Sequence, residues 1–192
     1  METQDTTALE FTVELEEAGD LFLNFVFASE EYNEFANSEF NDVLGIFVDD
    51  ENIALVDGET VSVNTINGGN PYGANARNAE FFKNNSPLDD GEYLSDIAYD
   101  GFTEILTATK MGLDAGVHHI RIAISDVSDS LYDSAVFIQA DSIATTALPV
   151  ATGGVLGTVY DAVGDRNTRR EQGQIVIHGN HIQNQLEFGI SV

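Results

Sequence analysis

The 192-residue chain contains no cysteine or tryptophan, and it has only three prolines and seven basic residues. Without cysteine it forms no disulfide, no thiolate metal site and no cysteine-based catalytic centre. It lacks any run of about 18 apolar residues, which argues against insertion into a membrane. The 33 acidic residues give a net charge of -26, which argues against nucleic acid and anionic lipid surfaces as partners.

The negative charge is concentrated in the first part of the chain. Residues 1–143 hold 29 acids and 4 bases, whereas residues 144–192 hold 4 acids and 3 bases. Because hydrophobic residues make up 43% of the chain, the acidic part is too apolar for a disordered polymer. The change in charge near Ala144 predicts a binding domain over residues 1–143. Residues 144–192 are expected to form a glycine-rich linker or tail with the capacity to add edge strands.

Short apolar segments with a period of two predict strands along most of the chain, and no segment has the period of an amphipathic helix. The expected strands are Phe11–Leu15, Leu21–Phe27, Asp42–Val48, Asn52–Val56, Val61–Ile66, Asp100–Thr109, His118–Ile124 and Ser134–Ile143, with Gln174–Ile177 and Leu186–Val192 as candidates in the tail. The polar stretch Asn67–Glu92 is typical of a long functional loop, with one helical turn near Ala76–Phe82. We therefore predict an all-β fold, a β-sandwich of about eight or more short strands with long calcium-binding loops and little helix.

Three groups of acidic residues lie next to the ends of predicted strands. They are Glu30, Glu31 and Asp42; Asp100 with Gly101; and Asp126, Asp129 and Asp133. A carboxylate beside buried strand residues is unfavourable unless a base or a cation compensates it, and four bases are too few for this domain. Carboxylate, amide and carbonyl oxygens are the donors that Ca²⁺ prefers. The pattern favours several bound calcium ions, with an ordinary solvated acidic surface as the alternative.

Four separate blocks of the sequence resemble the choice-of-anchor L domain, and they occur in the expected order. The blocks are Asn24–Phe47 (NFVFASEEYNEFANSEFNDVLGIF), Asn52–Leu55 (NIAL), Asp100–Thr103 (DGFT) and Ile122–Phe137 (IAISDVSDSLYDSAVF). Within that family, the chain is most similar to the calcium-dependent peptide-binding domain of bacterial RTX adhesins. The resemblance implies an extracellular, cell-surface module that captures the C-terminal residues of partner proteins through a calcium ion. The tail from Ala144 has no counterpart in these blocks.

The resemblance and the acidic groups together predict a set of site residues. We expect Asp100, Gly101, Asp126 and Asp129 near an exposed calcium ion, and Glu30, Glu31, Asp42 and Asp133 around it or around a second ion. The ligand-binding wall is expected to contain Asn33, Asn37, Asn41, Tyr72 and Asn75. The predicted partners are C-terminal peptides of surface proteins on other cells, bound by a monomeric module of a larger adhesin that mediates cell adhesion and biofilm formation.

Three other functions compete with this prediction. A lectin would complete the calcium sphere with a glycan hydroxyl pair, and a structural spacer would use calcium only for rigidity. A hydrolase would use two of the carboxylates as an acid pair, but their spacing does not distinguish catalysis from calcium binding. We expect no enzymatic activity.

Overall fold

Strands dominate the computed structural model, which describes residues 3–89, 91, 97–128, 132–146 and 174–177. The strands are β1 (Thr3–Leu15), β2 (Gly19–Ser29), β3 (Val43–Val48), β4 (Glu51–Asn52), β5 (Leu55–Val56), β6 (Glu59–Thr60), β7 (Phe82–Asn84), β8 (Gly101–Thr103), β9 (Leu106–Leu113), β10 (Gly116–Val127), β11 (Ser134–Ile138) and β12 (Gln174–Ile177). Two short 3₁₀ helices, η1 (Ala79–Phe81) and η2 (Pro87–Asp89), interrupt the long polar loop. The predicted all-β fold is confirmed.

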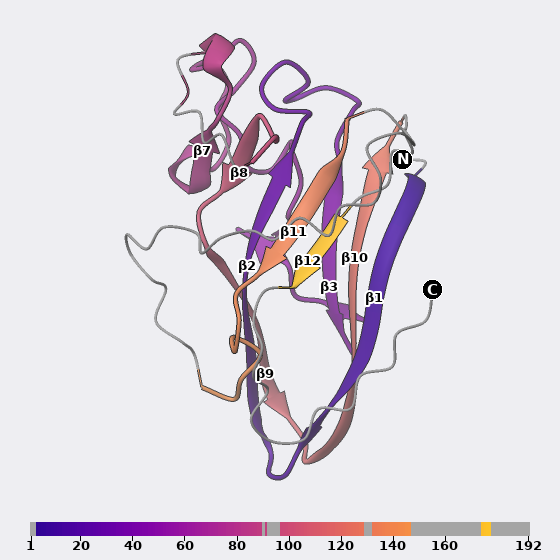
Figure 1. The fold of residues 1–192 in the computed structure, drawn as a ribbon. Coiled ribbons are helices and arrows are strands. Elements are labelled where there is room, and N and C mark those ends of the chain that lie inside the picture. Colours follow the sequence, from indigo (N-terminus) through magenta and orange to yellow (C-terminus); the bar gives the residue numbers. More distant parts are fainter. Residues whose placement is uncertain (1–2, 90, 92–96, 129–131, 147–173, 178–192) are drawn as a thin grey trace.

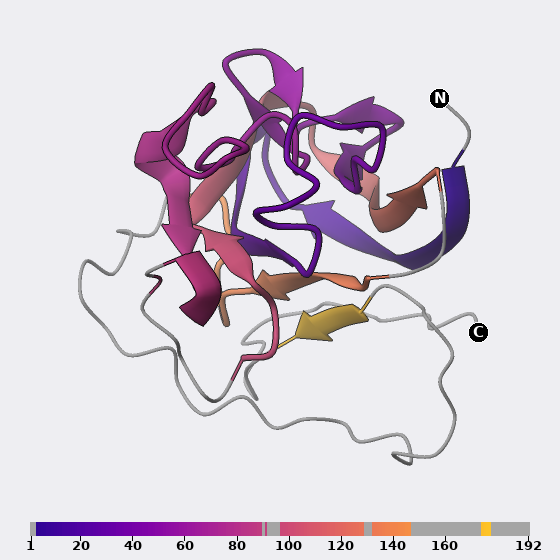
Figure 2. The same ribbon diagram turned by 90° about the horizontal axis from the view of Figure 1, so that it is seen from above.

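Two sheets form the sandwich. The first has the strand order β1-β10-β3-β4, and the second has the order β12-β11-β2-β8-β7, with β9 also paired to β2. All pairs within these sheets are antiparallel except β11 with β12. Figures 1 and 2 show the sheets as two layers, with the loops between strands at the two ends of the sandwich.

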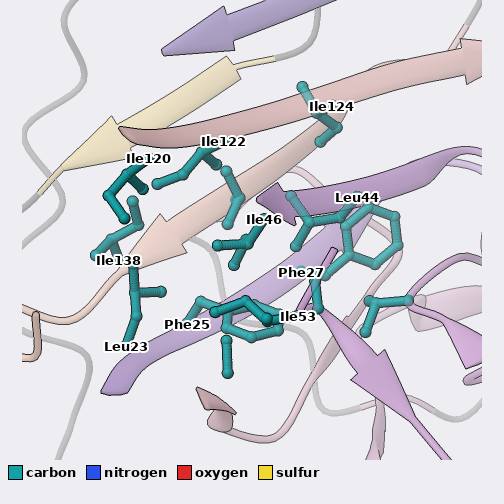
Figure 3. Packing of buried hydrophobic residues seen from close by; sticks show 14 of the residues in the cluster. Leu23, Phe25, Phe27, Leu44, Ile46, Ile53, Ile120, Ile122, Ile124 and Ile138 are labelled. Atoms are coloured by element: carbon teal, nitrogen blue, oxygen red, sulfur yellow. The ribbon is translucent and has the colours of Figure 1, made fainter. Parts of the chain in front are cut away.

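The apolar core lies between the sheets and follows the predicted alternation. In β10, Ile120, Ile122 and Ile124 are at most 1% exposed, whereas Arg121 between them is partly exposed and contacts Glu10 of β1. Figure 3 shows these isoleucines packing with side chains of β3, β2 and β11, namely Leu44, Ile46, Leu23, Phe25, Phe27 and Ile138. The period of two therefore sets which side chains fill the core.

The prediction of two strands at Asn52–Val56 and Val61–Ile66 is only partly correct. Asp57 and Gly58 form the turn between β5 and β6 with positive φ angles of 49° and 80°, as an Asp-Gly hairpin turn requires. The expected strand Val61–Ile66 is wrong, because only an isolated bridge and a buried turn occupy this segment. Ser62 N donates to Thr65 Oγ1 at 2.8 Å and Thr65 N donates to Ser62 Oγ at 3.2 Å. These side-chain bonds replace a strand ladder.

Other boundaries also differ from the sequence-based expectation. The expected strand Asp100–Thr109 is divided into β8 and β9, and Ser134–Ile143 ends at Ile138 as β11. The helical turn expected near Ala76–Phe82 is the 3₁₀ helix η1. The strand expected at Gln174–Ile177 is present as β12, whereas Leu186–Val192 lies outside the described residues.

The topology brings several loops to one end of the sandwich. Strands β2 and β10 end where their antiparallel neighbours β3, β8 and β11 begin, which is the upper end in Figure 1. In the register of the second sheet, Ser29 pairs with Ser134 on one side and with Gly101 on the other. In the first sheet, Ser125 pairs with Val43. Residues just beyond these pairs therefore meet, although up to about a hundred positions separate them along the chain.

Candidate functional site

Glu30 and Asp133 are joined at this end of the second sheet. Glu30 N donates to the Asp133 carbonyl at 3.0 Å, and Asp133 N donates to Glu30 Oε2 at 3.3 Å. Asp100 directly precedes β8 on the other side of β2. The carboxylate of Asp100 also acts electrostatically on Glu30. The sheet register thus brings one member of each predicted acidic group together.

Asp42 connects the two sheets at the same end. Asp42 Oδ2 accepts a hydrogen bond of 2.6 Å from Ser134 Oγ of β11, and its Oδ1 accepts one of 3.3 Å from Val127 N of β10. Asp126 follows Ser125, the register partner of Val43, and therefore lies across from Asp42. Both carboxylate residues are only 1% exposed. We use the term acidic end for Glu30, Glu31, Asp42, Asp100, Asp126 and Asp133.

The basic residues of residues 1–143 contact carboxylates at the protein surface. Their ion pairs are Arg77–Glu59, Lys83–Glu104, Lys110–Glu51 and Arg121–Glu10. The four glutamate side chains are between 46% and 64% exposed, so water already solvates them well. By contrast, Glu31, Asp42 and Asp126 are each 1% exposed. Burial of three acidic side chains in one region is unfavourable for their ionised forms and favours a compensating cation.

Crowding of acids perturbs the half-buried carboxyl groups of the acidic end. Burial raises the pKa of Glu30, the hydrogen bond from the Asp133 backbone N–H lowers it by less, and the negative charges of Asp133 and Asp100 raise it further. Burial also raises the pKa of Asp100, together with the charges of Glu34 and Asp89. A nearby divalent cation would reverse these shifts by favouring the ionised carboxylates.

Gly101 is required by packing at the start of β8. A Cβ atom built on this residue would lie 2.6 Å from the Phe82 ring and 2.8 Å from the Tyr32 ring. These two rings pack against each other with centroids 4.8 Å apart, and Tyr32 OH donates to the Ile66 carbonyl at 2.8 Å. A side chain at position 101 would therefore displace the aromatic support under Asp100. A calcium ligand role for the Gly101 carbonyl stays a prediction.

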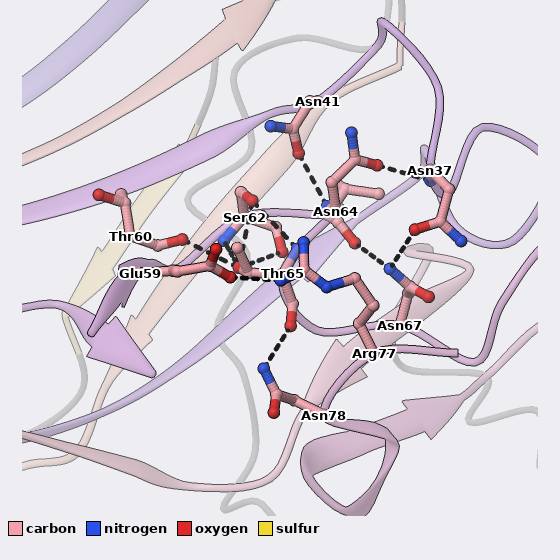
Figure 4. A network of polar contacts seen from close by, with 11 residues as sticks. Asn37, Asn41, Glu59, Thr60, Ser62, Asn64, Thr65, Asn67, Arg77 and Asn78 are labelled. Carbon is pink, nitrogen blue, oxygen red and sulfur yellow. Dashed lines mark hydrogen bonds and ion pairs between the residues drawn. The ribbon is translucent and has the colours of Figure 1, made fainter. Parts of the chain in front are cut away.

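Asparagine side chains tie the loop of residues 30–42 to the loop of residues 61–78. Asn37 N donates to Asn64 Oδ1 at 2.6 Å, Asn37 Nδ2 donates to the Asn75 carbonyl at 3.1 Å, and Asn64 N donates to Asn41 Oδ1 at 2.7 Å. Figure 4 shows this network, which continues through Asn67. Three predicted wall residues, Asn37, Asn41 and Asn75, thus lie together and fix the loops. Their contact with a ligand stays a prediction.

The other two predicted wall residues differ in exposure. Asn33 is buried, whereas Tyr72 is 48% exposed. The Tyr72 ring covers Gly68, where a Cβ atom would lie only 2.3 Å from it. Tyr72 therefore presents an aromatic surface to solvent on the loop that the asparagine network holds.

Two acidic residues that interact with Asp100 were not among the predicted site residues. Glu34 and Asp89 both act electrostatically on Asp100, and Asp89 Oδ2 accepts a hydrogen bond of 3.1 Å from Asn33 Nδ2. Asp89 belongs to the long polar loop, more than fifty positions after Asn33. No local spacing connects these residues, so only the tertiary contact reveals the relation. The sole sequence signal was the unusual length of the loop.

The described residues contain no group of three or more His, Cys, Asp or Glu side chains arranged so that they could hold a metal ion. Asp129, in the middle of the third predicted group, lies outside the described residues. The structure therefore shows convergence of the acidic groups, and calcium binding stays a prediction.

Comparison with known proteins identifies the family. The model of the Choice-of-anchor L domain matches residues 1–144, and the chain belongs to this family. Membership of this family indicates a surface-associated module. No curated protein and no solved structure matches significantly. In the part of the chain that the structure describes, no helix has the length and hydropathy needed to cross a membrane.

Proposed function

We propose that the chain is the calcium-dependent peptide-binding module of a large bacterial surface adhesin. The module captures the C-terminal residues of proteins on other cells, and this capture serves adhesion and biofilm formation. It has no enzymatic activity. One observation carries this proposal. Carboxylates from three separate parts of the chain converge on one end of the sandwich, and Glu31, Asp42 and Asp126 are buried there. Divalent cations compensate such a concentration of charge with the oxygen donors that are present.

Burial divides the acidic end into an inner and an outer part. The buried Glu31, Asp42 and Asp126 suit a structural ion that is closed to solvent. The half-buried Glu30, Asp100 and Asp133 suit an ion near the surface, with Asp129 as a further candidate ligand. This division assigns Asp126 to the inner ion, whereas the sequence alone suggested the outer one.

The outer ion would bind the peptide through its terminal carboxylate. Calcium takes about six to eight oxygen ligands, and protein side chains at a surface leave some positions to water. A peptide carboxylate replaces that water and brings a full negative charge, which a neutral C-terminal amide does not. Free-acid C-termini would therefore be selected over internal segments and amidated ends.

An aromatic cluster beside the outer ion supports recognition of peptide side chains. Phe35 packs against Phe40 with ring centroids 5.3 Å apart and against Tyr132 at 5.4 Å. Tyr132 is 46% exposed and directly precedes Asp133. Exposed aromatic rings contribute large apolar contact areas at low entropic cost. The cluster would pack against the apolar side chains that precede the terminal carboxylate.

A comparison of free-acid and C-terminally amidated peptides tests the proposal. We expect the full chain to bind free-acid peptides in the presence of calcium and to release them when a chelator removes the calcium. The amidated peptides should not bind. Asp126→Asn is expected to abolish binding and lower stability in calcium. Asp57→Asn is the matched control, because it removes the same charge from the β5–β6 turn, where asparagine tolerates the φ angle of 49°.

The same experiment separates the competing functions. Equal binding of acid and amide peptides would contradict carboxylate capture. Binding of glycans without peptides would favour the lectin. A calcium-dependent rise in melting temperature with neither class of ligand bound would favour the structural spacer.

A further inference from the structure

A second polar group lies beside the acidic end, between the loop that follows β2 and the loop that follows β7. Asn33 Nδ2 donates to Asp89 Oδ2 at 3.1 Å and to Asn84 Oδ1 at 3.0 Å. Asn84 also closes the turn that carries Asp89, because its Nδ2 donates to the Asp89 carbonyl at 2.8 Å and its Oδ1 accepts from Ser86 N at 3.0 Å. The Asp89 carboxylate is thus held against Asn33 by contacts from both loops.

The side-chain oxygen of Asn33 is evidence for a bound ligand. Asn33 is 3% exposed, and its Oδ1 is buried without a hydrogen-bond partner among the described residues, whereas its Nδ2 has two. A buried carbonyl oxygen without a partner costs about 1–3 kcal/mol, and native proteins usually satisfy it with protein, water or an ion. A donor or a cation at Asn33 Oδ1 would remove this cost.

Charge decides between water and a cation at this position. Asp89 accepts a hydrogen bond from Asn33, Glu34 is the chain neighbour of Asn33, and both carboxylates act electrostatically on Asp100. Burial raises the pKa of Asp100, and the negative charges of Glu34 and Asp89 raise it further. Lys83 of β7 contacts Glu104 at 2.7 Å, on the exposed side of its strand. A water molecule would satisfy the amide oxygen but leave the repulsion between the carboxylates unchanged. A cation would satisfy the oxygen and also reduce that repulsion.

We propose that Asn33 Oδ1 and the Asp89 carboxylate bind a divalent cation, with Glu34 and Asp100 supplying additional negative charge around it. The donor set is all oxygen, which selects calcium over softer metals, and water completes the coordination sphere. Glu34 is exposed and Asp89 half-buried, so the ion reaches this position from solvent. Its structural effect is to clamp the loop after β2 to the loop after β7. The site does not depend on peptide capture.

Counting bound ions in the full, calcium-stripped chain tests this site. Titration with calcium up to about 1 mM covers the affinities of extracellular calcium modules. Asp89→Asn is expected to bind one ion fewer than the unmodified protein, or to bind it at least about tenfold more weakly. Asn33→Asp adds a carboxylate but removes the Nδ2 group that donates to Asp89 and Asn84, so its melting temperature is expected to depend on calcium more strongly than that of the unmodified protein. Asp57→Asn removes an equal charge far from this position and should leave both number and affinity unchanged.

One result would overturn the site. If Asp89→Asn keeps the native circular dichroism spectrum and binds the same number of ions with the same affinities, a water molecule occupies the position at most. Asp89→Asn tests the site even if Asn33→Asp fails to fold, because Asp89 is only half-buried and its substitution should be tolerated. Loss of ions and peptide in Asp126→Asn, with Asp89→Asn unaffected, would contradict this site alone. Absence of peptide binding, with the Asp89-dependent ion present, would contradict only the proposed function.

Discussion

The hydrogen bond between Ser134 and Asp42 offers a quantitative test of how the two sheets are joined at the acidic end. Ser134 is 0% exposed, and its hydroxyl donates to Asp42 Oδ2 at 2.6 Å, the length of a charge-assisted bond. Ser134→Ala removes this donor and leaves the packing almost unchanged. No bulk water reaches the position to replace it. A hydrogen bond to a charged group contributes about 1.5–3 kcal/mol, so we expect the free energy of unfolding to fall by that amount.

Ser142→Ala is the matched control for this substitution. Ser142 is also buried, at 2% exposure, but its hydroxyl contacts neutral backbone groups of Asn24: it accepts from the N–H at 3.0 Å and donates to the carbonyl at 3.3 Å. A neutral bond contributes about 0.5–1.5 kcal/mol and the longer of the two contributes less, so Ser134→Ala should be the more destabilising substitution. Urea denaturation followed by circular dichroism measures both changes, and equal m-values would show that the comparison is valid.

Calcium adds a second measurement to the same pair of variants. If Asp42 is a ligand, Ser134 orients it, and loss of such an orienting contact weakens metal binding by about 10–100-fold. Ser142→Ala should leave the calcium affinity unchanged. A destabilisation by Ser134→Ala of less than about 0.5 kcal/mol would refute the claim that Asp42 is charged and held by this bond in the folded protein.

Two further predictions concern the opposite end of β10 and the core. His118 Nδ1 lies 2.6 Å from Asp49 Oδ2 and its Nε2 lies 2.8 Å from the Asp114 carbonyl, so both contacts require the protonated ring, and the pKa of His118 is raised by the Asp49 and Asp114 contacts. This stabilisation is complete below the ordinary value of 6.5 and is lost as pH rises through the raised pKa of the folded protein. NMR titration should show a lower His118 pKa in Asp49→Asn, and an unchanged pKa would contradict the ion pair. Ile122→Ala, at a wholly buried position, should reduce the free energy of unfolding by about 2–5 kcal/mol. Val117→Ala, on the same strand and 65% exposed, should change it by less than about 0.5 kcal/mol in the same urea denaturation, and similar values for the two would show that the core is misplaced.

Much of the sandwich was predictable because burial imposes a period of two on each strand. Ile120, Ile122 and Ile124 lie in the core as their alternation indicates. The segment Val61–Ile66 misled the prediction because its apolar residues Val61, Val63 and Ile66 are buried, although the segment forms a turn and not a strand. Apolar content reports burial, whereas side-chain hydrogen bonds to the backbone decided the local conformation.

The candidate site was predictable in its parts but not in its arrangement. Asp126 was expected near calcium because it adjoins apolar strand residues; it is buried, as is Asp42, which lies across from it. Glu34 lies in the same acidic segment as Glu30 and Glu31 but was not assigned to the site, and Asp89 was missed because nothing in its local surroundings distinguishes it from a solvated surface acid. Their relation to Asp100 appears only when the loops after β2 and β7 are placed together.

The sequence by itself determined the composition-dependent properties: an excess of acid, the absence of disulfides, the strand segments and the three acidic groups. These properties depend on residue type and on short-range periodicity, both of which can be determined from the sequence. The tertiary structure alone decided which acids meet, which are buried and which buried amide oxygen has no hydrogen-bond donor. Those outcomes follow from strand register and loop packing, which join residues about a hundred positions apart and leave no mark on local spacing.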